Sequence, residues 1–246
     1  MRAIIYAAGI SRRMHNFVPD GLKGLLKLGN KSLIEYQINW LTDYEPEEII
    51  IVLGLEHQRY IDEIGKKYNG VNINYVFNPD YKTKGNMLSL WHARNHTFDD
   101  VIFTTSDLLC DRRDIDHFMD SIEENKILID NKNTNLFHDD DPVKVQIEDE
   151  RIIGIRKRME DLERIDGISI GVYKFSKDLM GKLIQTIEKK IKSKNDNLSL
   201  YYPIDDTLSL SSVSPVYTNT SKWLDVDTPE ELLLAKEHIE NGTIKV

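Results

Sequence analysis

The sequence predicts an α/β fold in which a mostly parallel, mixed central sheet is flanked by helices. Two observations support this prediction. Apolar runs alternate with amphipathic segments along the first 110 residues, which is typical of strand–helix units. The run EIIIVLGL at 48–55 is continuously apolar, as expected for a parallel strand that is buried on both faces. The 246 residues, 40% of them hydrophobic, are enough to bury a sizeable core, so one domain is expected.

Four apolar runs predict the strands of the first half. They cover residues 2–6, 48–55, 71–79 and 100–109. Helices are expected at 32–43, 57–67 and 86–95. Ser32 is the expected N-cap of the first helix, with Glu35 three residues later. Ligands bind beyond the carboxyl ends of parallel strands, so the 7–13 loop and the turn at Ser106 and Asp107 are predicted to share one rim.

The second half of the chain shows a different pattern. Strands are expected at 126–130, at 143–155 as a pair around a tight Glu-Asp-Glu turn, at 167–175, and near the surface at 213–220. Helices are expected at 176–193 and 228–242. The latter has Thr228 as N-cap, Pro229 in its first turn and Gly242 as its stop. The pattern of residues 196–212 fits neither a helix nor a strand clearly, and their structure is left open.

Net charge indicates which partners the protein can bind, and cysteine content indicates its compartment. The formal net charge is -9, and an acidic chain repels nucleic-acid backbones and anionic membranes, so neither is expected as a partner. Cys110 is the single cysteine, which excludes an internal disulfide and suits a reducing compartment. No apolar run approaches the roughly 18 residues of a membrane span. We therefore expect a cytoplasmic protein that acts on small molecules.

The stretch IIYAAGISRRM, which begins at residue 4, indicates a phosphate-binding loop. Ala7, Ala8 and Gly9 follow a buried strand, and their small side chains let a ligand approach the backbone. The backbone N–H groups of such a turn form an anion-binding concavity. Arg12 and Arg13 come next, and either guanidinium can grip a phosphate oxygen. A strand followed by surface basic residues explains the same pattern equally well on local chemistry alone.

Six motifs, in chain order, resemble the signature of nucleotidyltransferases that activate phosphorylated sugars and alcohols. The first comprises AAGISRRM at 7–14, LKGLLKL at 22–28 and SLIEY at 32–36; the others lie at 78–94, 104–109, 151–159, 166–175 and 223–232. The family pattern has a second glycine where Ser11 stands and a proline where Leu22 stands. The resemblance implies a single-domain, Rossmann-like nucleotidyltransferase of GT-A type over 1–246. Its nucleotide-binding half would be 1–110 and its acceptor-binding half 111–246.

The resemblance also implies roles for the matching residues. Arg13 and Lys23 match basic catalytic residues, and Lys157 matches a lysine that reaches toward the acceptor phosphate. The implied nucleotide-binding residues are Ala7, Ala8, Gly9, Ser11, Arg12, Gly85, Asn86 and Ser106. Asp166 and Ser169 belong to the segment that matches the acceptor pocket.

A Mg²⁺ site is implied at Asp107 and Asp227, with Asp225 as a further ligand or a supporting group. Mg²⁺ is typically held by one or two carboxylates together with substrate phosphates. The chain has 41 acidic residues, and a lone aspartate at a strand end is usually a solvated cap or turn residue. The metal prediction therefore depends on both carboxylates lying on the same rim as the basic loop. The Asp run at 139–141 lies in an unplaced loop and is a weak candidate for metal binding.

The resemblance predicts Mg²⁺-dependent transfer of CMP from CTP to a small phosphorylated or phosphonylated acceptor, with release of pyrophosphate. Asn86 in the Gly-Asn step and the segment WLDVDTPEE resemble cytidylyltransferases for phosphocholine, aminoalkylphosphonate and inositol phosphate. The attacking phosphate is already ionised at neutral pH, so positioning and charge neutralisation suffice without a general base. The alternatives are a thymidylyl- or uridylyltransferase for a hexose 1-phosphate and a non-catalytic nucleotide-sensing module.

The acceptor stays open at this stage. A choline head group would need aromatic faces, which Tyr201, Tyr202 and Trp223 could supply, although core packing explains each of them as well. A phosphorylated amino acid, amide or sugar fits equally well. The sequence gives no indication of the oligomeric state.

Overall fold

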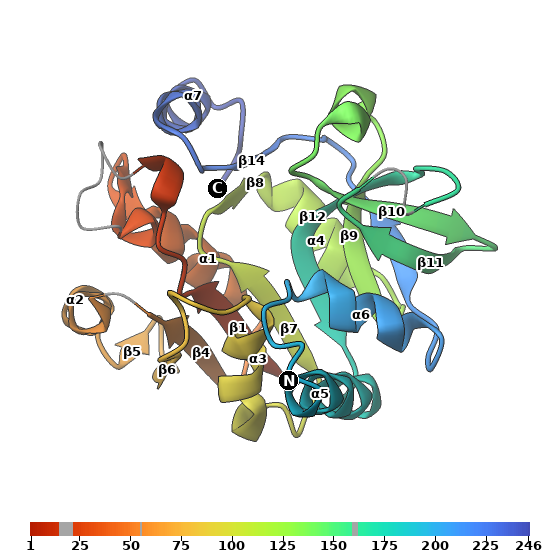
Figure 1. Cartoon of the computed structure of the whole chain (residues 1–246). Helices are drawn as coiled ribbons and strands as arrows, with labels where there is room; N and C mark the ends of the chain where they lie inside the picture. The colour runs from red at the N-terminus through yellow and green to blue at the C-terminus, as the bar shows by residue number, and fades with distance from the viewer. Residues whose placement is uncertain (15–21, 55, 159–161) are drawn as a thin grey trace.

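The computed structural model describes residues 1–14, 22–54, 56–158 and 162–246 (Figure 1). Within these residues the main sheet has ten strands, with the order β11-β10-β12-β7-β1-β4-β6-β5; β9 also pairs with β12, and β13 pairs with β9. At its centre lie β1 (Arg2–Ala7), β4 (Glu48–Leu53), β6 (Val71–Phe77) and β7 (Val101–Thr105), all parallel to their neighbours in this group. The predicted α/β class with a mixed sheet and a parallel centre is confirmed.

Helices cover both faces of this parallel centre. On one face lie α1 (Leu33–Thr42), α2 (His57–Ile64) and α4 (Arg112–Asp120); on the other lie α3 (Met87–His92), α5 (Lys177–Lys192) and α6 (Tyr201–Leu208). Neighbouring residues of β1 point to opposite faces, so Ile4 packs toward α3 and α5 while Ile5 packs toward α1 and α2. Because both faces are covered, β1, β4 and β7 are almost entirely buried, whereas β6 carries exposed Asn72 and Asn74.

The second half of the chain extends the sheet with mostly antiparallel strands. These are β9 (Lys126–Asp130), β10 (Val143–Glu148), β11 (Arg151–Arg156), β12 (Gly167–Phe175) and β13 (Ser214–Tyr217). The long strand β12 pairs antiparallel with β7, β9 and β10, so it joins the two halves into one sheet. The tight turn predicted between β10 and β11 is present, with positive φ angles at Asp149 and Glu150.

Short elements complete the fold around the rim. The hairpin of β2 (Lys27–Leu28) and β3 (Lys31–Ser32) precedes α1, and β5 (Lys67–Tyr68) pairs antiparallel with β6. The residues that the structure describes include the 3-10 segments η1 (Arg12–Met14), η2 (Lys23–Leu25), η3 (Arg94–His96) and η4 (Thr134–His138). Helix α7 (Pro229–Glu240) begins at the predicted cap, where Glu231 N–H donates to Thr228 Oγ1 at 3.2 Å. In the described part of the chain, no helix is long and apolar enough to cross a membrane.

The structure corrects several predicted boundaries. The strand expected at 100–109 ends at Thr105; after a turn the chain forms β8 (Leu108–Cys110), which pairs antiparallel with β14 (Trp223–Asp225). The helix expected at 57–67 ends at Ile64, because Gly65 has a φ of +78° that leaves the helical path. The helix expected at 86–95 ends at His92 and continues as η3.

Two segments of the second half also differ from expectation. Residues 196–212, which were left open, contain α6. Strand β13 is not superficial, since Val216 is buried and the strand pairs parallel with β9 in the main sheet.

Candidate active site

The carboxyl ends of β1 and β7 fix the position of the site. The N–H of Ser106 donates to the carbonyl of Tyr6 at 3.0 Å, so the turn after β7 is held against the end of β1. The N–H of Val226 donates to the carbonyl of Asp107 at 2.9 Å, which holds the segment after β14 on the same turn. These two backbone bonds place Asp107 and Asp227 beside the loop that follows β1, as the sequence predicted for this rim.

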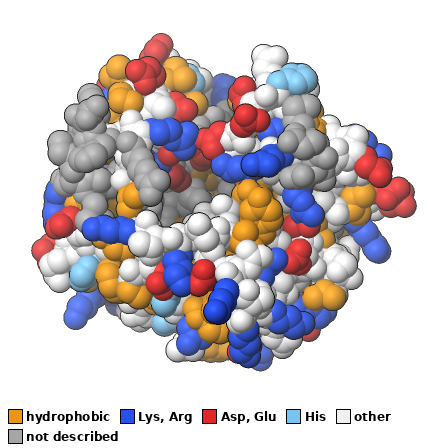
Figure 2. Space-filling view, in the orientation of Figure 1, with side chains coloured by type: hydrophobic (Ala, Val, Ile, Leu, Met, Phe, Trp, Pro, Cys, Tyr) orange, Lys and Arg blue, Asp and Glu red, His pale blue; other side chains and the backbone are white. Residues whose placement is uncertain are grey.

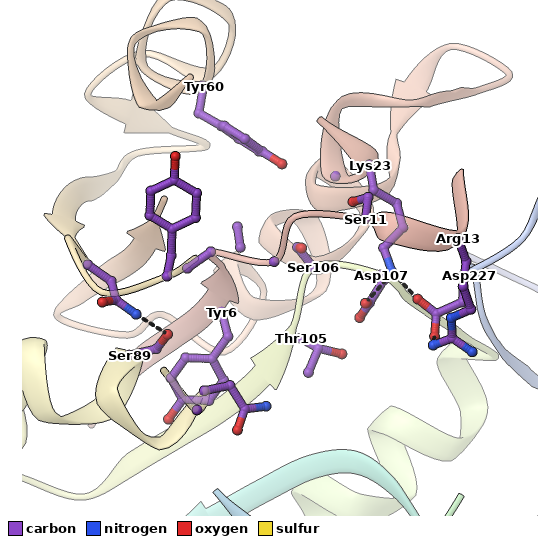
Figure 3. A pocket seen from close by; sticks show the side chains of 18 of the residues that line it. Tyr6, Ser11, Arg13, Lys23, Tyr60, Ser89, Thr105, Ser106, Asp107 and Asp227 are labelled. Carbon is purple, nitrogen blue, oxygen red and sulfur yellow. Dashed lines mark hydrogen bonds and ion pairs between the residues drawn. The ribbon is translucent and has the colours of Figure 1, made fainter. Parts of the chain in front are cut away.

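Four charged side chains form a cluster on this rim (Figure 3). Lys23 Nζ lies 2.6 Å from Asp107 Oδ2 and also pairs with Asp227 Oδ1. Arg13 pairs with the other carboxylate oxygen of Asp227. Burial alone would lower the pKa of Lys23, but the charges of Asp107 and Asp227 raise it. Burial alone would raise the pKa of Asp107, but Lys23 lowers it. Lys23 and Asp107 are therefore both charged at neutral pH.

Asp225 stands apart from this cluster. It makes no ion pair within the described residues, and it lines a cavity at the rim. Desolvation in the cleft and the negative charges of Asp107 and Asp227 raise its pKa well above the usual value for an aspartate.

The two rim carboxylates have the donor chemistry of a magnesium site. Asp107 and Asp227 each direct an oxygen at one cationic point, the Lys23 ammonium. Hard oxygen ligands from one or two carboxylates are what Mg²⁺ usually takes from a protein, while phosphates and water complete the shell. Among the described residues, no group of three or more His, Cys, Asp or Glu side chains is arranged to hold a metal by itself. The residues therefore fit an ion that binds together with a phosphorylated substrate.

A first cavity of about 410 Å³ opens beyond the end of β1. It is lined by Tyr6, Ala7, Ala8, Gly9, Ser11, Arg13, Lys23, Gly24, Tyr60, Asn78, Tyr81, Lys84, Gly85, Asn86, Ser89, Thr105, Ser106, Asp107 and Asp227. Of the residues predicted to bind a nucleotide, all but Arg12 are in this lining. The backbone of Arg12 belongs to η1, and its side chain lies outside the described residues. Ser11 has a φ of +48°, the left-handed conformation that explains why glycine suits this position in the family pattern.

The Gly-Asn step is held by the segment that leads into α6. A side chain at Gly85 would collide with the backbone of Leu198, so only glycine fits this approach. The N–H of Met87 donates to the carbonyl of Leu198 at 3.3 Å. The N–H of Leu200 donates to Asn86 Oδ1 at 2.7 Å. The carboxamide oxygen of Asn86 is thus engaged, and among the described residues its NH₂ group has no hydrogen-bond acceptor, so it can donate to a ligand.

A second cavity of about 710 Å³ adjoins the first. Six residues line both: Tyr6, Arg13, Asn86, Thr105, Asp107 and Asp227. The second cavity adds Lys157 and Ser169 from the second half, the acidic residues 139–141, and the aromatic side chains of Tyr173, Tyr201 and Trp223. Figure 2 shows acidic and basic side chains gathered along the edge of the hollow between the two halves.

The two residues predicted to bind the acceptor, Asp166 and Ser169, lie in different surroundings. Ser169 lines the second cavity, and its hydroxyl donates to Tyr173 Oη at 3.0 Å. Asp166 is not among the described residues that line either cavity. Its carboxylate accepts from the N–H of Ile147 at 2.7 Å and pairs with Arg164. A role for Asp166 in acceptor binding stays a prediction.

Sequence analysis missed several residues that line the cavities. Tyr60, Asn78 and Tyr81 line the first cavity. Asn78 and Tyr81 lie within the motif at 78–94, which predicts no role for them individually, and Tyr60 lies on α2 outside every motif. Asp141 was treated as part of an unplaced loop. In the structure its carboxylate lies between Arg13 and Lys157, at 2.7 Å from each. In the sequence, the signal for this contact was the acidic run at 139–141 together with the basic motif residues Arg13 and Lys157.

The parallel centre, the small-residue loop at its rim and the paired charges of the site agree with the nucleotidyltransferase class that the sequence motifs indicate. Comparison with protein families identifies the family to which the chain belongs. Residues 3–138, more than half of the chain, match the family described as the MobA-like NTP transferase domain, and the chain belongs to this family.

Curated relatives resemble the chain along most of its length. It is 25% identical over 246 residues to the bifunctional IPC transferase and DIPP synthase of Archaeoglobus fulgidus, a match that covers 100% of the chain and 45% of the relative. It thus spans less than half of that protein. It is also 25% identical over 255 residues to the CTP:phosphoglutamine cytidylyltransferase of Campylobacter jejuni, covering 94% of the chain and 98% of the relative.

Solved structures share the fold over nearly the whole chain. An inositol-1-phosphate CTP transferase from T. maritima superimposes with a TM-score of 0.76 at 17% identity, covering 98% of this chain and 96% of the other. A UDP-glucose pyrophosphorylase in complex with UDP-glucose gives 0.79 at 14% identity, covering 98% of both chains. At these identities the likeness shows the fold alone.

Proposed function

We propose that the protein is a cytidylyltransferase that transfers CMP from CTP to a small phosphorylated or phosphonylated acceptor and releases pyrophosphate. One observation carries this proposal: the two cavities adjoin, and Arg13, Asp107 and Asp227 line both. A nucleoside triphosphate in the first cavity and an acceptor in the second would therefore meet at a single charged rim. Such a meeting point is what a transfer between two bound substrates needs.

The bond changes require little chemistry from side chains. An oxygen of the acceptor phosphate attacks the α-phosphorus of CTP, forms a new P–O bond and displaces pyrophosphate as the bond to the β-phosphate breaks. The attacking oxygen is already ionised, so no proton has to be removed. Negative charge increases on the leaving pyrophosphate, and preorganised cations that face this charge lower the barrier.

Three basic residues lie where they could neutralise charge on the substrate phosphates. Lys23 is held on the rim by two carboxylates and is nearly buried, so its charge is poorly screened by water. We assign Lys23 and Arg13 to the triphosphate and the departing pyrophosphate. Lys157 lines only the second cavity, and we assign it to the acceptor phosphate.

Asp107 and Asp227 would hold Mg²⁺, with Asp225 nearby as a supporting group. A bound Mg²⁺ neutralises phosphate charge and orients the substrates. The two carboxylates now pair with Lys23 and Arg13. Substrate phosphates would take over these two cations, which frees the carboxylate oxygens.

The choice of CTP rests on two supports. Two relatives matched along at least 94% of this chain are an IPC transferase and a CTP:phosphoglutamine cytidylyltransferase. In the cavity itself, the NH₂ group of Asn86 is a donor, which suits the acceptor N3 of cytosine better than the N3–H of uracil. The alternative is a uridylyl- or thymidylyltransferase for a hexose 1-phosphate, since a solved structure with this fold holds UDP-glucose.

A substrate panel tests the proposal. The purified protein is incubated with Mg²⁺, one labelled nucleoside triphosphate and one of several phosphorylated alcohols, amines, amino-acid amides or sugars, and pyrophosphate release is measured. We expect release only with an acceptor present and the highest kcat/KM with CTP. A preference for UTP or dTTP with a hexose 1-phosphate would favour the alternative. Nucleotide binding without turnover across the panel would favour a sensing module.

A further inference from the structure

A buried lysine that the proposed mechanism does not use holds the edge of the second cavity together. Lys144 of β10 has no exposed surface, and its ammonium donates to the carbonyls of Asp139, Pro142 (3.3 Å) and Lys157 (2.8 Å). These carbonyls belong to two chain segments, the loop before β10 and the end of β11. Lys144 therefore fixes the loop 139–142 beside Lys157. Burial lowers the pKa of Lys144, although the nearby negative charges of Asp140 and Asp139 act in the opposite direction.

The clamped loop brings one carboxylate to both cations that face the second cavity. Asp141 Oδ1 lies 2.7 Å from Lys157 Nζ, and Asp141 Oδ2 lies 2.7 Å from Arg13 Nη1. Arg13 comes from the loop after β1 and Lys157 from the second half, so this carboxylate links the two substrate-binding halves. Two oxygens that bridge two cations reproduce the way in which a phosphate group would be bound.

We propose that Asp141 is an internal substitute for the acceptor phosphate: it occupies the Arg13–Lys157 pair before the acceptor binds and has to leave when the acceptor arrives. The identity of that anion rests on the proposed function, whereas the competition for the two cations does not. Asp141 is suited to such an exchange because 57% of its side chain is exposed. Exposed ion pairs are weak, so a doubly charged phosphate can displace it.

The charge state of Asp141 is favourable for this role. Burial alone would raise its pKa, but hydrogen bonds with Lys157 and Arg13 lower it to about 2. The carboxylate is therefore ionised throughout the physiological range, and it competes with anions in the cleft at every working pH. Until the acceptor binds, Asp141 holds Arg13 and Lys157 in place and weakens their binding to other anions.

Inorganic phosphate is the probe, because its binding to the protein requires neither CTP nor turnover. Calorimetric titration compares the wild-type protein with Asp141→Asn and with Asp140→Asn. Asp140 is a matched control: it lines the same cavity in the same loop, and within the described residues it makes no ion pair. We expect D141N to bind phosphate roughly twofold to thirtyfold more tightly than wild type, the range for losing two competing exposed ion pairs.

A third comparison tests whether the tighter phosphate binding of D141N depends on Lys157. In a Lys157→Met background, the D141N substitution should give a much smaller gain, because one of the two released cations is absent. Equal or weaker phosphate binding by D141N, no measurable binding by it, or an equal gain in D140N would each overturn the inference. If the D141N gain is seen while no acceptor is turned over in the substrate panel, the proposed function fails and the competition stands.

Discussion

Replacing Asn86 by aspartate tests how the proposed site distinguishes cytosine from uracil. The N–H of Leu200 donates to Asn86 Oδ1 at 2.7 Å, so one side-chain oxygen must be kept to hold the segment before α6. Aspartate keeps that oxygen and is almost the same size as asparagine. It exchanges only the NH₂ group, a donor, for an oxygen, an acceptor.

The expected change follows from matching donors with acceptors at the base. In the wild-type protein the NH₂ of Asn86 can donate to N3 of cytosine, whereas uracil presents an N3–H there. In the N86D variant the match is reversed, because a carboxylate oxygen accepts from that N3–H. An unmatched buried polar group costs about 1–3 kcal/mol, so the ratio of kcat/KM for CTP to that for UTP should fall by about one to two orders of magnitude.

The assay is steady-state pyrophosphate release with each nucleotide at a fixed, saturating acceptor concentration. Asn86→Ala is the matched control, because it removes both the donor and the oxygen that holds Leu200. It should lower the ratio while also lowering the melting temperature, whereas N86D should keep the wild-type melting temperature. An unchanged ratio in N86D, or equal losses for CTP and UTP, would refute base reading by this side chain.

Two further predictions concern the charged cluster on the rim. Asp107→Asn and Asp227→Asn should each give a folded protein that has lost most of its activity, since each removes a proposed Mg²⁺ ligand; turnover near the wild-type rate at saturating Mg²⁺ would exclude that residue as an essential ligand. Lys23→Ala should lower kcat by about 100-fold or more and change the KM for CTP much less, because its charge is needed most as pyrophosphate leaves. A raised KM with unchanged kcat would show that Lys23 only binds the nucleotide.

The parallel centre of the fold could be predicted because its signals are local. Strands β1 and β4 coincide with apolar runs, and the capped helices begin where the sequence indicates: Thr228 caps α7, and Glu35 accepts from the N–H of Ser32 at 2.6 Å. The boundaries were wrong where a turn interrupts an apolar run. The run at 100–109 continues through Leu108 and Leu109, which are buried in β8 rather than in the main sheet.

The rim of the site was also predictable, for a topological reason. The carboxyl ends of parallel strands meet at one edge, so Gly9 and Asp107 had to lie close together. Asp227 joins them through the pairing of β14 with β8, and only its motif indicated this before the structure was known.

The sequence could not predict contacts between residues that lie far apart in the chain and share no motif. Asp141 and Arg13 are 128 positions apart, and the bond from Leu200 to Asn86 spans 114 positions. Neither contact follows from periodicity or spacing, because both depend on how antiparallel strands extend the parallel centre. These contacts supply the detail from which base and acceptor recognition are argued.

The most direct test of the account is the transfer reaction itself, measured with CTP and UTP in parallel. Purified protein, Mg²⁺ and a panel of phosphorylated acceptors are assayed for pyrophosphate and for the nucleotide-linked product. We predict a CMP-linked product that forms only with an acceptor, with kcat/KM for CTP at least about tenfold above that for UTP. A UMP- or dTMP-linked sugar as the main product, or equal rates with CTP and UTP, would contradict it.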